Sequence, residues 1–328
     1  MPLADPIRSL AGHTGRVSAV VFLKSGQLAS ASVDATIRLW DIAAGEEKQV
    51  LSGHAGPVMA LAANGEGNLL ASAGKDPVIK VWQIGSADPP KNLSAGGGGS
   101  NERAILGLAW SADGKRLAVA TQDSPRIQLW DLPEGKQGKQ LSPPDLKGDS
   151  RQTIFSLAFL PEGKLLASAG ADRAIRLWDL ESAKESKQIG GIEYSVIPDD
   201  GKEIKREKKS GGSTQALYSL AISGDGRHLA AAGLERVIRV WEISSGNLVA
   251  TLPGHSRFVT GLAFSPDSKR LASCDHGGDL RLWDLAATKS SFAARIPASA
   301  QSLAYSPDGA LLAVAGGDSK VHLVSLPS

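Results

Sequence analysis

Short runs of alternating apolar residues recur along the whole chain, and six of them end in a tryptophan that is usually followed by an acid. The runs are TIRLWD, VIKVWQ, RIQLWD, AIRLWD, VIRVWE and DLRLWD, with their tryptophans at Trp40, Trp82, Trp130, Trp178, Trp241 and Trp283. The steps between them are 42, 48, 48, 63 and 42 residues, and a degenerate seventh copy, VHLVS, places Val324 another 41 residues on. A period near 42 residues with this motif indicates a repeat of four short antiparallel strands.

Within a repeat, the strands follow from period-two patterns between turn residues. The fourth copy predicts strands at 154–159, 165–168 and 174–178, with a turn at 161–164. An outer strand follows the tryptophan motif, as at 48–51 and 248–252. Turn sequences such as Ser306-Pro307-Asp308-Gly309 end in a glycine that can adopt a positive φ, which closes a tight hairpin.

The count of strands predicts how the two ends of the chain are related. Seven copies of the first three strands end at Leu326 with no outer strand left for the last copy, whereas residues 6–10 form an outer strand with no repeat before it. We therefore expect the N-terminal strand to pair into the seventh unit, which closes the ring and removes exposed sheet edges. This organisation resembles the seven-bladed WD40 β-propeller family.

The resemblance predicts an all-β fold in which residues 1–328 form one β-propeller domain. The chain begins almost directly inside a strand, so an excised domain of a longer polypeptide is an alternative to a complete protein. A 63-residue step between the fourth and fifth tryptophans predicts an insertion hairpin at about 191–212. The segment Gly96-Gly97-Gly98-Gly99-Ser100 has the composition of a flexible linker, either natural or engineered.

Composition narrows the class of protein. The chain has 328 residues, 42% of them hydrophobic, 37 glycines and a formal net charge of +2, so neither nucleic acid nor an anionic membrane is favoured as a partner. It has no secretory apolar region and no run of about 18 apolar residues, which predicts a cytoplasmic location. Cys274 lies in an apolar strand pattern and is expected to be a buried, unreactive thiol. The six histidines show no paired spacing, so we expect neither a metal site nor a cofactor.

In the family that the chain resembles, a buried tetrad stabilises each blade: a His before the first strand, a Ser or Thr in the second strand, an Asp in the next turn, and the Trp. The first copy matches with His13, Ser30, Asp34 and Trp40, and the second with His54, Ser72, Asp76 and Trp82. The sixth keeps His255, Ser273 and Trp283 with Gly277 at the aspartate position, and the fourth keeps Ser168, Asp172 and Trp178 with Gly148-Asp149 in place of Gly-His. Copies three, five and seven lack the His and the Ser.

The tetrads also resemble the inventory of a Ser-His-Asp catalytic triad. A catalytic set occurs once and at a cleft, whereas this set recurs at fixed offsets from a tryptophan. We therefore interpret it as structural.

The resemblance also predicts which side chains surround the mouth of the central channel. In WD40 propellers, the residue after the first apolar position of each innermost strand lies near this mouth and often touches peptide ligands. These positions are Ser18, Met59, Leu106, Phe155, Tyr218, Thr260 and Gln301, with Phe258 just before its strand and with Lys75 and Gln122 as polar anchors on the surrounding rim. Aromatic side chains and Met are enriched in interface cores. Two interpretations stay open: these side chains bind a partner, or they plug the channel against one another.

The sequence thus predicts a non-enzymatic scaffold that binds an unidentified peptide or protein partner on the face with the channel mouth, alone or as a module of a larger assembly. A propeller hydrolase is an alternative, since Asp275 and His276 are expected on the rim. Nucleic-acid binding through the basic segment 202–209 is a third.

Overall fold

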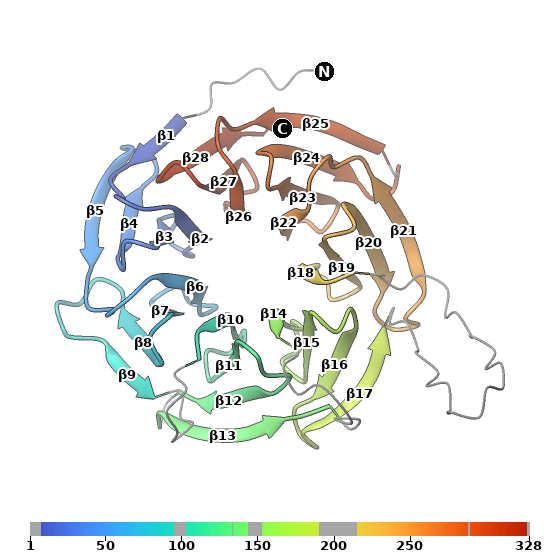
Figure 1. Ribbon diagram of the computed structural model, residues 1–328, viewed down its shortest axis with the longest axis horizontal. Coiled ribbons are helices and arrows are strands. Elements are labelled where there is room, and N and C mark those ends of the chain that lie inside the picture. The colour runs from blue at the N-terminus through green and yellow to red at the C-terminus, as the bar shows by residue number, and fades with distance from the viewer. Residues whose placement is uncertain are drawn as a thin grey trace.

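The computed structural model describes residues 8–94, 103–132, 134–143, 153–189, 215–287 and 289–326, without the side chains of 289–293. Its strands form seven four-stranded antiparallel sheets arranged around a central channel (Figure 1). The regular structure in these ranges consists of strands alone, and none of these residues belongs to a helix that could cross a membrane. The predicted all-β, seven-bladed propeller is confirmed.

Each sheet is a blade, numbered here along the chain and built from its innermost strand outward. Blade 1 contains β2 (Val17–Phe22), β3 (Leu28–Ser32), β4 (Ile37–Asp41) and β5 (Glu46–Leu51); blade 2 contains β6 (Val58–Ala63), β7 (Leu69–Gly74), β8 (Val78–Gln83) and β9 (Lys91–Ser94). Blade 3 contains β10 (Ile105–Trp110), β11 (Arg116–Thr121), β12 (Ile127–Asp131) and β13 (Lys136–Leu141); blade 4 contains β14 (Ile154–Phe159), β15 (Leu165–Gly170), β16 (Ile175–Asp179) and β17 (Lys184–Ile189). Blade 5 contains β18 (Leu217–Ile222), β19 (His228–Gly233), β20 (Val237–Glu242) and β21 (Leu248–Pro253); blade 6 contains β22 (Val259–Phe264), β23 (Arg270–Asp275), β24 (Asp279–Asp284) and β25 (Lys289–Arg295).

Blade 7 takes its strands from both ends of the chain: β26 (Ala300–Tyr305), β27 (Leu311–Gly316), β28 (Lys320–Ser325) and, as the outer strand, β1 (Arg8–Ala11). β1 runs antiparallel to β28, with Arg8 opposite Leu323 and Ala11 opposite Lys320. Leu10 of β1 is buried against this blade. Hydrogen bonds between the two ends of the chain therefore complete the seventh sheet.

The core lies between neighbouring blades. The second strands are buried on both faces and are rich in Ala, as in LASAS of β3 and LLAVAG of β27, because small side chains let adjacent sheets pack closely. Trp40 of blade 1 shares a buried cluster with Ala313 and Leu323 of blade 7, and Trp82 of blade 2 shares one with Leu39 of blade 1. Each of these tryptophans therefore fills the space between its own blade and the preceding one.

Every innermost strand contains a β-bulge near its start, beside the channel mouth. In blade 1, Val17 lies opposite Ser32 and Ala19 opposite Ala31, so Ser18 has no partner in the ladder. The same shift occurs in all seven blades, and the skipped residues are Ser18, Met59, Leu106, Phe155, Tyr218, Thr260 and Gln301. A bulge redirects the side chain of its extra residue. These are the seven positions that the sequence predicted for the mouth.

Candidate partner-binding site at the channel mouth

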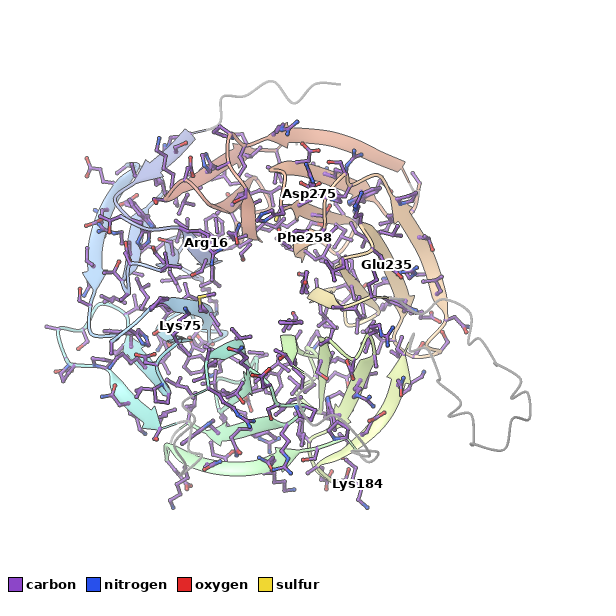
Figure 2. All side chains as sticks on the ribbon, in the orientation of Figure 1. Arg16, Lys75, Lys184, Glu235, Phe258 and Asp275 are labelled. Atoms are coloured by element: carbon purple, nitrogen blue, oxygen red, sulfur yellow. The ribbon has the colours of Figure 1, made fainter. Side chains whose placement is uncertain are left out.

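The seven bulge residues line one hollow of about 330 Å³. Its described lining consists of Ser18, Met59, Leu106, Phe155, Tyr218, Thr260 and Gln301, together with Arg16 and Phe258. Arg16 directly precedes β2 and Phe258 directly precedes β22, and both lie beside the central opening in Figure 2. Each of the seven bulge side chains is partly buried and partly accessible. They therefore line the mouth without filling it.

Four aromatic rings form a continuous arc across blades 4, 5 and 6. The ring centroids of Phe155 and Tyr218 lie 5.1 Å apart at 76°, and those of Tyr218 and Phe258 lie 5.8 Å apart at 71°. Phe258 also stacks on the exposed His276, with centroids 4.6 Å apart at 17°. Edge-to-face pairs of this kind are favourable, so the rings hold one another in place before any partner arrives.

Two of the polar bulge residues, Ser18 and Thr260, make hydrogen bonds across blade boundaries. Ser18 Oγ donates to the carbonyl of Val58, which ties blade 1 to blade 2. Thr260 Oγ1 donates to the carbonyl of Ala300 at 2.9 Å, which ties blade 6 to blade 7. The apolar bulge side chains of blades 2 and 3, by contrast, carry no hydroxyl or amide group that could make such a bond. At the mouth, Ser18 and Thr260 thus hydrogen-bond across blade boundaries, whereas the apolar side chains of Met59 and Leu106 make no such bond.

The two predicted polar anchors lie outside the hollow. Lys75 follows β7 and Gln122 follows β11, and both side chains are exposed. The Lys75 N–H donates to the carbonyl of Pro57 at 3.0 Å, which places it beside the start of β6. Sequence reasoning missed Arg16, although its place directly before the innermost strand was a usable signal.

The tetrads of blades 1 and 2 form closed hydrogen-bond networks. In blade 1, Ser30 Oγ lies 2.8 Å from His13 Nε2 and accepts the Trp40 Nε1–H at 2.8 Å, while His13 Nδ1 lies 2.9 Å from Asp34 Oδ2. Blade 2 repeats the set: His54 Nε2 lies 2.7 Å from Ser72 Oγ and His54 Nδ1 lies 2.8 Å from Asp76 Oδ2, while the Trp82 Nε1–H donates to Ser72 Oγ at 2.8 Å. These networks connect the second and third strands of each blade, and the turn between them, with the loop before the first strand.

Burial and hydrogen bonding together determine how the blade 1 network titrates. Burial lowers the pKa of His13 and outweighs the opposing effect of Asp34. For Asp34, burial alone would raise the pKa, but hydrogen bonds from Thr36, from the Thr14 N–H and from His13 bring it down to about 2. The carboxylate is therefore ionised and the imidazole tends to the neutral form near pH 7.

The Ser-His-Asp order of these networks matches a catalytic triad in connectivity but not in surroundings. Ser30 and Ser72 have no accessible surface, and each hydroxyl oxygen already accepts a tryptophan N–H. No substrate carbonyl could approach such an oxygen. The arrangement supports the structural interpretation of the tetrads.

Blade 6 corrects the sequence prediction. Gly277 was expected at the aspartate position and Asp275 on the rim, and both expectations are wrong. Asp275 is fully buried at the end of β23, and its Oδ2 lies 3.1 Å from His255 Nδ1, while His255 Nε2 lies 2.7 Å from Ser273 Oγ. Burial would raise the pKa of Asp275, but its hydrogen bonds, chiefly with His255, hold it at about 2. The tetrad of blade 6 is complete, with its acid two residues earlier than in blades 1 and 2.

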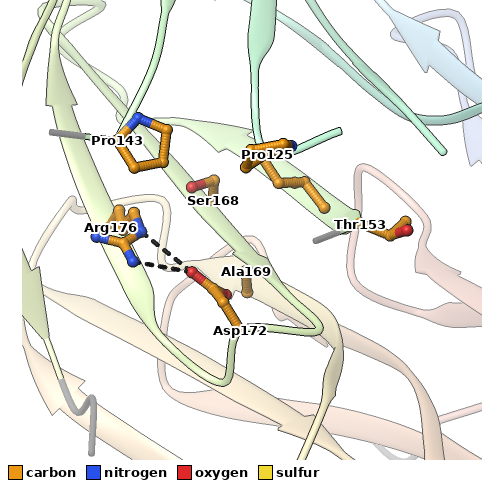
Figure 3. A pocket seen from close by; sticks show the side chains of 8 residues that line it. Pro125, Pro143, Thr153, Ser168, Ala169, Asp172 and Arg176 are labelled. Carbon is orange, nitrogen blue, oxygen red and sulfur yellow. Dashed lines mark hydrogen bonds and ion pairs between the residues drawn. The ribbon is translucent and has the colours of Figure 1, made fainter. Parts of the chain in front are cut away.

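Blade 4 keeps two tetrad members in contact and redirects the third. The Trp178 Nε1–H donates to Ser168 Oγ at 2.9 Å, but Asp172 pairs with Arg176 at 3.0 Å. A small cavity adjoins Ser168, Asp172 and Arg176, with Pro125 and Pro143 on its other side (Figure 3). The Gly148-Asp149 pair lies outside the described residues. Arg176 also reaches Glu185 at 2.8 Å, so an ion-pair network replaces the Asp-His contact in this blade.

The remaining blades depart further from the tetrad. The buried Nε1–H groups of Trp110 and Trp130 in blade 3 have no hydrogen-bond partner among the described residues. In blade 7, sequence reasoning missed His322, which is buried between Ser9 of β1 at 3.0 Å and Asp318 at 3.1 Å. This histidine connects the two ends of the chain.

Cys274 has no accessible surface, and burial raises the pKa of its thiol to about 12, as expected for an unreactive thiol. Within the described ranges, no three His, Cys, Asp or Glu side chains are placed to hold a metal ion. The linker 96–100, the insertion 191–212 and its basic segment 202–209 lie outside those ranges.

Comparison with known proteins agrees with this architecture. The family model described as "WD domain, G-beta repeat" matches residues 4–41, 45–83, 142–179, 205–242, 246–284 and 297–325. These matches cover more than half of the chain. The chain belongs to the WD40-repeat family. Blade 3, which lacks the His and the Ser of the tetrad, lies between the matched segments of this WD40 protein.

Several longer proteins are similar to it. Nuclear distribution protein PAC1 of Coccidioides posadasii is 30% identical over 301 residues, which cover 87% of this chain and 60% of that protein. Nuclear distribution protein nudF of Emericella nidulans is 30% identical over 298 residues, covering 87% and 63%. Transcription initiation factor TFIID subunit 5 of Caenorhabditis elegans is 28% identical over 245 residues, covering 64% and 35%. The chain spans less than two thirds of the length of each of these relatives.

Proposed function

We propose that this WD40 propeller is a non-enzymatic scaffold that binds a peptide or protein partner at its channel mouth. One observation carries the proposal: four consecutive blades place Met59, Leu106, Phe155 and Tyr218 at bulge positions around one accessible hollow. Apolar side chains that retain accessible surface around a concavity are typical of binding sites. The ring contacts of Phe155 and Tyr218 supply a rigid surface, so little conformational entropy is lost on binding.

The alternative that these side chains only plug the channel is less well supported. A plug would bury the side chains against one another, whereas each of them keeps part of its surface accessible and a hollow remains between them. The edge-to-face contacts fix the rings at the border of the opening and leave its centre free.

The non-enzymatic part of the proposal is supported by the surroundings of His276. The acid next to it in sequence, Asp275, is buried and bonded to His255, so it does not orient the imidazole of His276. His276 instead stacks on Phe258. A hydrolase would require another acid, and a screen of hydrolase substrates against wild type and His276→Ala tests this alternative.

The relatives support an interaction role without naming a partner for this chain. We extend the proposal to a single propeller domain over residues 1–328, located in the cytoplasm, that acts alone or as one module of a larger assembly. Because the relatives are longer, none of their own partners is assigned to this protein.

Binding of peptides from a phage-displayed random library tests the site. Peptides selected on the wild type should bind the Phe155→Ala, Tyr218→Ala double variant at least about tenfold more weakly, because two anchors of a hydrophobic hot spot are lost. The matched control is Leu248→Ala, Val249→Ala, which removes two exposed apolar side chains from β21 on the outer edge of blade 5. Unchanged binding to the mouth variant, with folding intact, would refute the site.

A further inference from the structure

Around the mouth, exposed basic side chains are available to a partner, whereas the nearby tetrad acids are already hydrogen-bonded. Arg16 lines the hollow, and its described lining includes no carboxylate. Lys75 lies beside the start of β6 in the neighbouring blade, and Arg257 directly precedes Phe258. All three side chains are exposed, and none makes an ion pair or a side-chain hydrogen bond with a residue that the structure describes.

The tetrad carboxylates of the same three blades are already hydrogen-bonded. Asp34, Asp76 and Asp275 lie in or next to the turns of blades 1, 2 and 6, and each bonds to the histidine of its own tetrad. Asp34 also accepts the N–H groups of Thr14 and Thr36, and Asp275 accepts that of Gly277. These acids are therefore turned into the blades, where they cannot pair with the three exposed cations.

Within the described residues, the turn acids of blades 3, 4 and 5 do not offset this excess of available positive charge. Asp172 pairs with Arg176, and Glu235 pairs with Arg239. Asp123 of blade 3 is exposed, but the guanidinium of Arg103 donates to its backbone carbonyl at 3.1 Å and so lies close to it. The free charge nearest to the hollow is positive.

We propose that the partner is an acidic peptide segment, in which an Asp or Glu carboxylate is held by Arg16 and Lys75 while a neighbouring aromatic or aliphatic side chain packs on the Phe155, Tyr218 and Phe258 arc. This inference rests on the proposed function and names the chemistry of its partner. Figure 2 shows Arg16 and Lys75 on one side of the opening, with Phe258 on the adjoining side. An extended peptide that crosses the mouth would meet both surfaces.

The chemistry of the two cations suits this role. A guanidinium presents a planar fork of donors that matches a carboxylate, and Lys75 adds a second, flexible positive charge. Because the hollow is partly enclosed by apolar side chains, a carboxylate there is screened less by water than one on an open surface. The cations would select acidic segments and reject basic ones.

The test uses the full chain and peptides selected from the phage-displayed random library. Consensus peptides should combine Asp or Glu with an aromatic or aliphatic residue. Their affinity for Arg16→Gln, Lys75→Gln should fall on the order of tenfold, the size of a lost charge-assisted hydrogen bond. The matched control is Lys184→Gln, an exposed lysine of β17 on the outer edge of blade 4 (Figure 2), which should bind as wild type does.

A second arm replaces the acid of the peptide by its amide. The amide peptide should bind wild type about tenfold more weakly, yet lose little further affinity on Arg16→Gln, Lys75→Gln, because the two changes remove the same contact. Peptides that lose affinity on Phe155→Ala, Tyr218→Ala but keep it on Arg16→Gln, Lys75→Gln would overturn the acidic anchor while the scaffold function stands. Peptides indifferent to both variants would overturn the two proposals together.

Discussion

Blade 3 contains a defect that one substitution should repair. The Nε1–H of Trp130 is buried and has no hydrogen-bond partner in the part of the chain that the structure describes. In blades 1, 2, 4 and 6, the residue ten positions before the tryptophan is a serine whose Oγ accepts this N–H at 2.8 to 2.9 Å. In blade 3 that position is Ala120, which is fully buried. We expect Ala120→Ser to supply the missing acceptor.

The magnitude follows from the contacts. Leaving a buried donor unpaired costs about 1–3 kcal/mol, and part of this gain is offset because the new hydroxyl must itself leave water. We expect Ala120→Ser to raise the free energy of unfolding by about 1 kcal/mol. For a chain of this length, the unfolding entropy converts that gain to an increase in Tm of about 1.5 °C. Blade 4 shows that the serine suffices, since Trp178 donates to Ser168 although its blade has no Asp-His contact among the described residues.

Urea unfolding followed by tryptophan fluorescence measures the change, and a double-mutant cycle identifies its origin. In a Trp130→Phe background, Ala120→Ser should lose its advantage, because no N–H remains to be paired. Ala29→Ser is the matched control: it buries the same hydroxyl in a second strand whose blade already has its serine, so it should be neutral or destabilising. A gain of the same size with Phe at position 130, or a loss with Trp there, would refute the reasoning.

Three further outcomes are expected. Asp275→Asn should lower the free energy of unfolding in urea by about 2–4 kcal/mol, because it disturbs a buried network. Asp279→Asn, whose partner Arg295 has an exposed guanidinium, should lower it by under about 1 kcal/mol. Equal losses would contradict the assignment of Asp275 to the blade 6 tetrad. Burial lowers the pKa of His13 and His54, so the unfolded chain takes up protons first as the pH falls, and the free energy of unfolding should decline below pH 6.5; a flat profile between about pH 5 and about pH 7.5 would argue against this. Leu10→Ala should lower the free energy of unfolding by about 2–3 kcal/mol if β1 closes the ring, and unchanged stability would show that the closure contributes little.

The architecture could be predicted from the sequence because the same strand pattern recurs in seven copies. The tryptophan motif and its spacing define the third strand of each blade, and the remaining strands follow by alternation between turns. The strand at 154–159 has the bounds that the pattern predicted. A pattern repeated at this length leaves few other folds, so local errors in single copies do not change the result.

Blade 6 shows where an offset rule fails. The rule placed the acid six residues before the tryptophan, as with Asp34 and Asp76, and found Gly277 there. The network requires a carboxylate oxygen beside His255 Nδ1, and an acid at a different offset from the tryptophan can supply it. Asp275 reaches that point from the end of β23, and the turn that follows contains Gly278 at a φ of +86°, where a side chain would collide with the carbonyl of Ala298. Two backbone routes thus place the same chemical group, and spacing alone cannot distinguish them.

The bulges explain why binding at the mouth can be tested separately from stability. Ser18 and Thr260 hydrogen-bond across blade boundaries, so their replacement would weaken the ring itself. Phe155 and Tyr218 occupy the same bulge position but contribute partly exposed rings, whose mutual contact is worth about 0.5–1.5 kcal/mol beyond the area that it buries. Removing them should therefore leave the propeller folded. A binding defect in the double variant would then report on the surface it presents, whereas the same defect in Ser18→Ala could come from a loosened ring.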